Sequence, residues 1–133
     1  MKKIINLFKF IIKAKKIWTK PNKSEVLIYD YNLSEYFKEK ILKFDCEVLH
    51  IRGEIINIFI LIKLIKKLKF KNLLLNYSML YIEEVRPKVI ITGTDNNLNF
   101  YDLQNQIKSF KFKSIVIQNG HRTLTGPDIL NYF

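Results

Sequence analysis

Runs of apolar residues alternate along the chain with stretches of helical periodicity. Four short runs rich in Val and Ile span residues 25–30, 47–51, 88–93 and 114–119. Each run is mostly apolar at consecutive positions, which is typical of strands that are covered on both faces. The pattern therefore predicts four buried β-strands.

Amphipathic helices are predicted between these strands, over residues 35–43, 55–70, 76–85 and 100–109. Ser34 can cap the first of them. The helix over 55–70 places apolar residues early and lysines late, as the helix dipole favours. The helix over 76–85 is expected to end before Pro87, because a proline forces the preceding residue out of helical geometry.

Strands that alternate with helices predict an α/β fold with a parallel sheet. Right-handed crossovers permit a doubly wound, Rossmann-like domain over residues 21–133, with helices on both faces of the sheet. The strands would lie in the spatial order 47–51, 25–30, 88–93 and 114–118. Four strands make a small sheet, so the domain is expected to be truncated or to lack a second domain.

Residues 1–20 are predicted to form a separate segment, an amphipathic basic helix that is separated from the first strand by Pro21. Isoleucines, Leu7 and Phe8 share one face of this helix, and lysines surround that face. Two readings are open. The helix either lies in an anionic lipid interface, with the lysines of 63–71 adding to the same surface, or packs its apolar face against the sheet or an absent second domain and leaves the lysines in water.

The 133-residue sequence has a formal net charge of +11, concentrated in the lysines of residues 2–16 and 63–71. Either a surface that meets anionic lipid or nucleic acid, or the codon usage of an AT-rich genome, accounts for this charge. The single cysteine, Cys46, excludes an internal disulfide and a cysteine-based metal site. Lys9 interrupts the apolar start, and no run approaches the roughly 20 residues of a membrane span. We therefore expect a cytoplasmic protein, with peripheral attachment to the inner face of the membrane as a further option.

Polar side chains follow each of the four predicted strands, whereas lysines and ordinary loop residues precede them. Ligands of parallel sheets bind outside the carboxyl ends of the strands, so a ligand site is predicted at this edge. The candidate catalytic residues are Asp95, Glu54 and His121. The candidate substrate-binding residues are Asp30, Arg52, Thr94, Asn96, Asn97, Gln118, Asn119, Gly120 and Arg122.

Several of these candidates also have a purely structural alternative. Asp95 can accept a proton or a sugar hydroxyl, or it can cap the following helix together with the two asparagines after it. Glu54 can act as a base in the cleft, or it can begin the next helix. His121 can act as a general base, or it can be an exposed residue after a tight turn. Arg122 can hold a phosphate with its planar guanidinium.

Several common mechanisms lack their motifs in this chain. No G-x-G-x-x-G fingerprint follows a strand, and there is neither a P-loop nor a G-x-S-x-G nucleophile elbow. Two histidines without clustered carboxylates predict no zinc site. A receiver-like regulator would carry two adjacent acids after the first strand, where this chain has only Asp30.

The stretches "VLIYD", "RGEIINIFIL", "RPKVIITGTDNNLNFYDL" and "IQNGHR" together resemble bacterial surface-polysaccharide (O-antigen) biosynthesis proteins. That family is similar to the GT-B glycosyltransferases and the polyol-phosphate transferases, and the resemblance covers most of residues 25–122. It implies the first, acceptor-binding domain of a GT-B fold. It also implies a glycan or lipid-linked glycan acceptor, and a nucleotide-activated sugar donor held by a second Rossmann-like domain or chain. In that scheme this chain binds no cofactor itself and is not expected to transfer a sugar alone.

The alternative is a non-enzymatic basic α/β module that binds nucleic acid or a protein partner. Nucleic-acid binding needs aromatic residues interleaved with lysines on one accessible face. Phe8, Phe10 and Phe70 instead fit the core-facing side of helices, so nucleic acid is not an expected partner.

Overall fold

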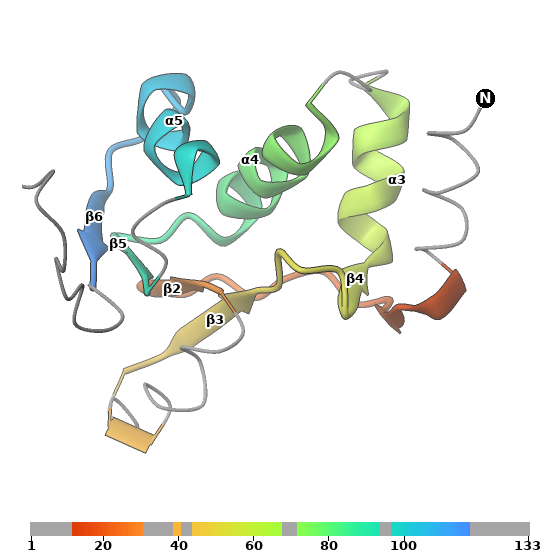
Figure 1. Cartoon of the computed structure of the whole chain (residues 1–133), viewed down its shortest axis with the longest axis horizontal. Helices are drawn as coiled ribbons and strands as arrows, with labels where there is room; N and C mark the ends of the chain where they lie inside the picture. The colour runs from red at the N-terminus through yellow and green to blue at the C-terminus, as the bar shows by residue number, and fades with distance from the viewer. Residues whose placement is uncertain (1–11, 31–38, 41–43, 68–71, 94–96, 118–133) are drawn as a thin grey trace, which may run out of the picture.

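The computed structural model of the chain describes residues 12–30, 39–40, 44–67, 72–93 and 97–117. Within these ranges the strands and helices follow one another along the chain as the sequence pattern broadly predicts (Figure 1). Their order is β1 (Lys15–Ile17), β2 (Val26–Tyr29), β3 (Cys46–Leu49), β4 (Ile55–Asn57), α3 (Ile58–Lys66), α4 (Leu73–Val85), β5 (Val89–Thr92), α5 (Leu98–Gln106) and β6 (Lys113–Val116).

Four of the strands form one parallel sheet in the spatial order β3–β2–β5–β6. Ile28 of β2 lies opposite Val48 of β3 on one side and opposite Ile91 of β5 on the other. The predicted α/β class and the predicted order of these four strands are therefore confirmed. The burial predicted for the fourth strand is wrong, because β6 lies at the edge of the sheet and three of its four residues are exposed.

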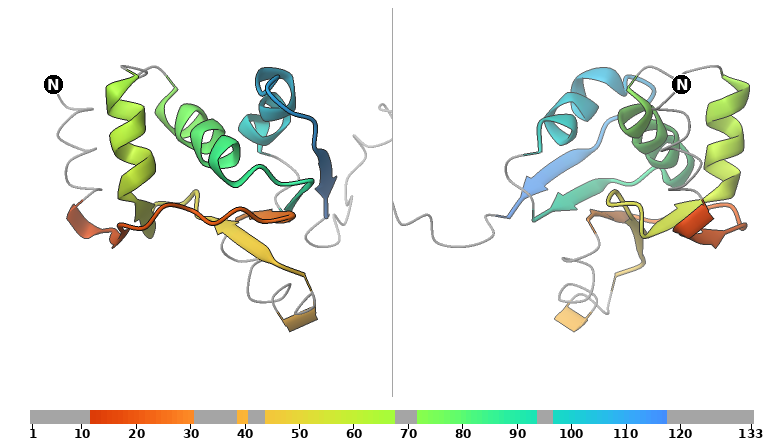
Figure 2. Two further views of the ribbon diagram at one scale, coloured as in Figure 1. Left: turned by 180° about the vertical axis from the view of Figure 1, so that it is seen from behind. Right: turned by 45° about the vertical axis from the view of Figure 1, so that its right-hand side comes forward.

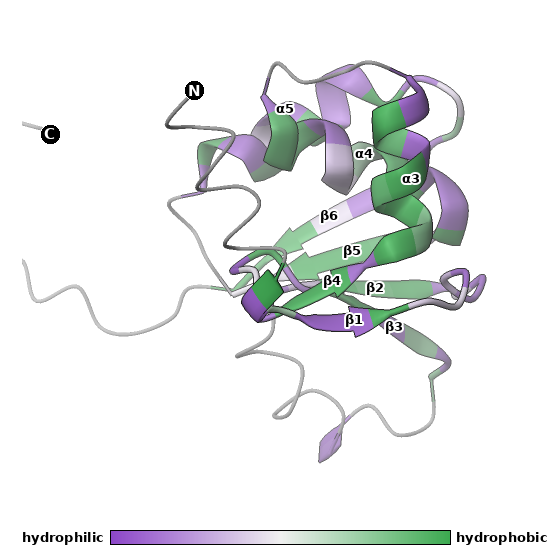
Figure 3. Cartoon of the chain, turned by 90° about the vertical axis from the view of Figure 1, so that its right-hand side faces the viewer, coloured by the Kyte–Doolittle hydropathy of each residue, from purple (hydrophilic) through white to green (hydrophobic). Residues whose placement is uncertain are grey.

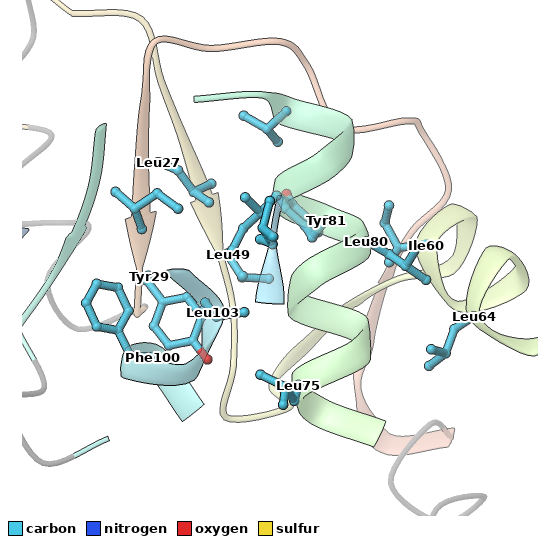
Figure 4. Packing of buried hydrophobic residues seen from close by; sticks show 14 residues of the cluster. Leu27, Tyr29, Leu49, Ile60, Leu64, Leu75, Leu80, Tyr81, Phe100 and Leu103 are labelled. Atoms are coloured by element: carbon cyan, nitrogen blue, oxygen red, sulfur yellow. The ribbon is translucent and has the colours of Figure 1, made fainter. Parts of the chain in front are cut away.

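The main core lies between this sheet and the three described helices (Figure 4). Leu27, Tyr29 and Ile90 project from the sheet into it, because alternate residues of a strand face the same side. Tyr29 packs against Phe100 of α5, with ring centroids 5.2 Å apart. The same cluster includes Leu64 from α3, so one continuous core joins all three helices to the sheet.

The opposite face of the sheet carries a smaller cluster of buried apolar residues, Ile28, Val48 and Ile91. Helices α3, α4 and α5 all lie on the other side of the sheet, whereas residues 39–40 lie on this side in both views of Figure 2. These two helical residues are the described part of the helix predicted over 35–43. Among the described residues, helical cover on this second face of the sheet is therefore limited to residues 39–40.

A second, two-stranded sheet corrects two helix predictions. Strand β1 pairs in parallel with β4, so that Lys15 lies opposite Ile55 and Ile17 opposite Asn57. The helix expected over residues 1–20 is therefore wrong where β1 forms, at Lys15–Ile17, and residues 1–11 lie outside the described residues. The helix expected over 55–70 likewise begins as a strand, because β-branched isoleucines suit a half-buried strand as well as a helix.

Side chains of asparagine fix where two of the helices begin. Asn57 caps α3 by accepting a hydrogen bond from the backbone N–H of Ile60, at 3.2 Å. Asn97 caps α5 by accepting one from the N–H of Asn99, at 3.1 Å. Helix α4 ends at Val85. The next residue, Arg86, adopts a left-handed conformation with φ of 54° and precedes Pro87. The predicted stop before the proline is confirmed.

Across the part of the chain described here, no helix combines the length and the apolar character that crossing a bilayer requires.

Candidate functional site

The carboxyl ends of β2 and β3 bring two of the predicted site residues together. Asp30 directly follows β2, and its side chain is 4% exposed. Arg52 follows β3, the neighbouring strand, and its Nη2 donates to Asp30 Oδ2 at 2.9 Å. The strand order therefore places these residues in contact, although 22 positions separate them in the sequence.

The ion pair holds the guanidinium of Arg52 at the edge of the sheet. A buried carboxylate requires a charged or hydrogen-bonding partner, which Arg52 supplies. The Arg52 side chain is itself 48% exposed, and a guanidinium has several N–H donors in a planar fork. The pair therefore presents donor groups to solvent while its carboxylate holds the guanidinium in place.

The carboxyl end of β5 lies beside Asp30 because β5 pairs with β2. Thr92 is buried at this end, and its Oγ1 donates to the backbone oxygen of Tyr29 at 3.0 Å, which ties the two strand ends together. Asn97, a predicted substrate-binding residue, begins the following helix. Its side-chain oxygen accepts the capping hydrogen bond, so the alternative in which this asparagine caps the helix is confirmed for Asn97.

Glu54, a predicted catalytic residue, is exposed and lies directly before β4. Its backbone oxygen accepts a hydrogen bond from the N–H of Lys15 at 2.8 Å. Because α3 begins only at Ile58, Glu54 is not in the first turn of that helix. The alternative in which Glu54 begins the helix is therefore wrong.

The remaining candidates lie outside the described residues. They are Thr94, Asp95, Asn96, Gln118, Asn119, Gly120, His121 and Arg122.

The opposite edge of the sheet has the chemistry that the sequence predicts for it. Lys88, just before β5, forms an ion pair with Glu25, just before β2. Both side chains are largely exposed, at 75% and 60%. An exposed ion pair of this kind contributes little to stability. The amino edge therefore differs from the carboxyl edge, where the carboxylate of the ion pair is buried.

A groove that the sequence did not reveal lies near the amino edge, between α3 and α4. Its volume is about 490 Å³, and it is near the starts of β5 and β6 because Arg86 and Ser109 precede those strands. Its lining residues are Lys63, Lys66, Lys67, Leu80, Glu83, Glu84, Arg86 and Ser109. The lysines of α3 were recognisable in the sequence as a cluster of charge. Their proximity to Arg86 was not, because it depends on how α3 packs against α4.

Glu84 organises the charges in this groove. Its carboxylate forms ion pairs with Lys20 and Lys63. Burial alone raises the pKa of Glu84, but hydrogen bonds and charge attraction from the two lysines outweigh burial, so the pKa is lowered. Lys66 and Arg86 have no carboxylate partner among the residues that the structure describes. The groove therefore keeps a local excess of positive charge.

The described ranges hold no group of three His, Cys, Asp or Glu side chains that could bind a metal ion. Comparisons with family models, with curated proteins and with solved structures give no match for this chain. Its functional interpretation therefore depends on the geometry above.

Proposed function

We propose that the chain is a glycosyltransferase-like domain of surface-polysaccharide biosynthesis, with the Rossmann-like arrangement of the first domain of a GT-B enzyme. It binds a glycan acceptor at the carboxyl edge of the four-stranded sheet. The observation that carries the proposal is the contact between buried Asp30 and half-exposed Arg52 at the ends of adjacent strands. Parallel α/β sheets bind their ligands at this edge.

The chemistry of this edge suits a polyhydroxylated ligand. Sugar hydroxyls both donate and accept hydrogen bonds, and the exposed N–H groups of Arg52 offer donors held in a fixed orientation. Asp95 or His121 would accept the proton of the reacting hydroxyl, with Glu54 as a third candidate. Arg122 would bind a phosphate if the acceptor is lipid-linked.

Transfer requires a partner in this proposal. The nucleotide-activated sugar would be held by a second Rossmann-like domain or chain, and its leaving diphosphate would be stabilised across the cleft. The chain by itself binds the acceptor and does not turn over.

Titrating the ¹⁵N-labelled protein with simple sugars tests acceptor binding directly. We expect N-acetylglucosamine, galactose or rhamnose to shift amide signals near Asp30, Arg52 and Gly93, whereas uridine diphosphate shifts them little. Signals near Glu25 and Lys88 should stay unchanged.

Matched variants at the two edges sharpen this test. Removing Arg52 alone takes the ion-pair partner away from a buried carboxylate, so the double variant Asp30→Asn/Arg52→Met is the cleaner probe. We expect it to weaken sugar binding at least tenfold, while Glu25→Gln/Lys88→Met, the pair at the amino edge, leaves binding intact. Unchanged sugar binding by the first double variant, in a folded protein, would rule out the proposed site.

A further inference from the structure

The pairing of β1 with β4 joins two basic segments into one unit. Residues 12–20 and 55–67 contain seven lysines and no Asp or Glu. Strand β1 lies in the first segment, and β4 leads directly into α3 in the second. The two segments also share a small core, in which Ala14 packs with Ile58 and, at its edge, Leu61. The two segments therefore form a positively charged unit that contains no carboxylate side chain.

Large apolar side chains are exposed on the same unit. Trp18 and Ile12 are 70% and 71% exposed, and Ile62 and Ile65 of α3 are 46% and 49% exposed. Ile62 and Ile65 lie one helical turn apart, on the side of α3 away from the buried Leu64. Figure 3 views the molecule from this side, with apolar α3 above the more hydrophilic β1. We call the exposed residues of this unit the β1–α3 face: Ile12, Lys13, Lys15, Lys16, Trp18, Ile62, Ile65 and Lys66.

The lysines on this face differ in pairing from neighbouring lysines whose charge is neutralised by a carboxylate. Lys20 and Lys63 pair with Glu84. Lys13, Lys15 and Lys66 have no carboxylate partner in the described ranges, and Lys16 Nζ donates only to backbone oxygens, at 3.1 and 3.3 Å. Unpaired cations therefore border the exposed isoleucines and the tryptophan.

We propose that the β1–α3 face docks the protein on an anionic lipid bilayer. Trp at the headgroup level, aliphatic side chains inserted beneath it and lysines on the anionic surface are the features of interfacial attachment. A nucleic acid would engage the lysines through its phosphates and stack bases on the tryptophan. It would leave the three isoleucines without a role, so the bilayer fits the whole face better. This docking is independent of the proposed glycan site, which uses the carboxyl edge of the other sheet.

Trp18 is the only tryptophan in the chain, so its fluorescence reports directly on this face. We expect its emission to shift to the blue, and to be quenched by brominated lipids, when the protein meets vesicles containing about one-third phosphatidylglycerol. Pure phosphatidylcholine vesicles should leave the emission unchanged. High salt should release the protein, because screening weakens the attraction of the lysines.

Two sets of variants separate the charged and apolar contributions. Replacing Lys13, Lys15 and Lys16 by glutamine should weaken binding about 100-fold, since each lysine near an anionic leaflet contributes about fivefold. Ile62→Ser/Ile65→Ser should abolish the blue shift in a protein whose circular dichroism is unchanged, because both side chains are already half exposed. The control Leu98→Ser, an exposed apolar residue at the start of α5, should bind vesicles as the unmodified protein does.

Three outcomes would overturn the proposal. They are unchanged Trp18 emission with anionic vesicles at low salt, equal binding to neutral vesicles, and salt-sensitive binding to a random DNA duplex without any binding to vesicles. None of them would bear on the sugar titration, so this proposal and the proposed function fail separately.

Discussion

Glu84 of α4 connects three segments, because its carboxylate pairs with Lys20 after β1 and with Lys63 of α3. The variant Glu84→Gln removes the charge and nearly preserves the size of the side chain. It also leaves the two lysine ammonium groups close together without the anion between them. We expect the variant to fold and to be less stable than the unmodified protein.

The size of the effect follows from how far each group is exposed. The Glu84 side chain is 11% exposed, whereas those of Lys20 and Lys63 are 56% and 40% exposed. Exposed ion pairs contribute about 0.2–1 kcal/mol each, and a largely buried carboxylate belongs at the upper end of that range. Losing two such pairs should lower the free energy of unfolding by about 1–2 kcal/mol. That loss corresponds to a decrease in Tm of roughly 3–10 °C for a chain of this length.

The effect should depend on pH in a defined direction. Burial raises the pKa of Glu84, but the two lysines more than offset this, and the folded-state pKa lies below the unfolded one. A carboxyl of this kind stabilises the fold above its unfolded pKa of about 4.3. The stabilisation is lost as the pH falls through the folded-state pKa. The difference between the two proteins should therefore be constant near neutral pH and shrink below about pH 4.

Urea unfolding followed by circular dichroism, at pH 7 and at acid pH, measures both effects. Glu83→Gln is the matched control, because Glu83 is 37% exposed and lies 4.0 Å from Lys67. We expect that variant to lose less than about 0.5 kcal/mol. The reasoning fails if Glu84→Gln costs no more than its control, or if its effect is undiminished at acid pH.

Two further predictions concern the core and can be checked by the same unfolding measurement. Tyr81→Phe should cost about 1–3 kcal/mol, because the single O–H of Tyr81 has two acceptors within hydrogen-bond distance, Glu47 Oε1 at 2.8 Å and the backbone oxygen of Val48 at 3.2 Å. Leu103→Ala should cost about 2–5 kcal/mol, because Leu103 is 1% exposed. Leu98→Ala, in the same helix but at a position 78% exposed, should change the stability by no more than about 0.5 kcal/mol.

The main sheet was predictable because its strands carry their signal locally. Runs such as that around Ile28 are apolar on both faces, which is typical of parallel strands that are covered on both sides. Right-handed connections then permit the strand order that the sheet has. Asp30 and Arg52 were individually predictable for the same reason, since each directly follows such a run.

The second sheet was not predictable from local pattern. Ile55 and Ile56 match a helix and a strand equally well, and only their pairing with Lys15 and Lys16 decides between the two. The charged groove was missed for a related reason. One of its lining residues, Arg86, has a left-handed conformation. A non-glycine residue adopts this conformation at a cost, and local sequence pattern does not predict it.

The parallel pairing of β1 with β4 also has a consequence for how the protein folds. Lys15 pairs with Ile55, so the contact closes a long loop that contains two strands of the main sheet. Loop closure is entropically unfavourable, and only three residue pairs form in return. We therefore expect β1 to join after the main sheet has assembled and to separate before it unfolds. Such a late-forming unit can open alone while β2, β3 and β5 keep the carboxyl edge intact.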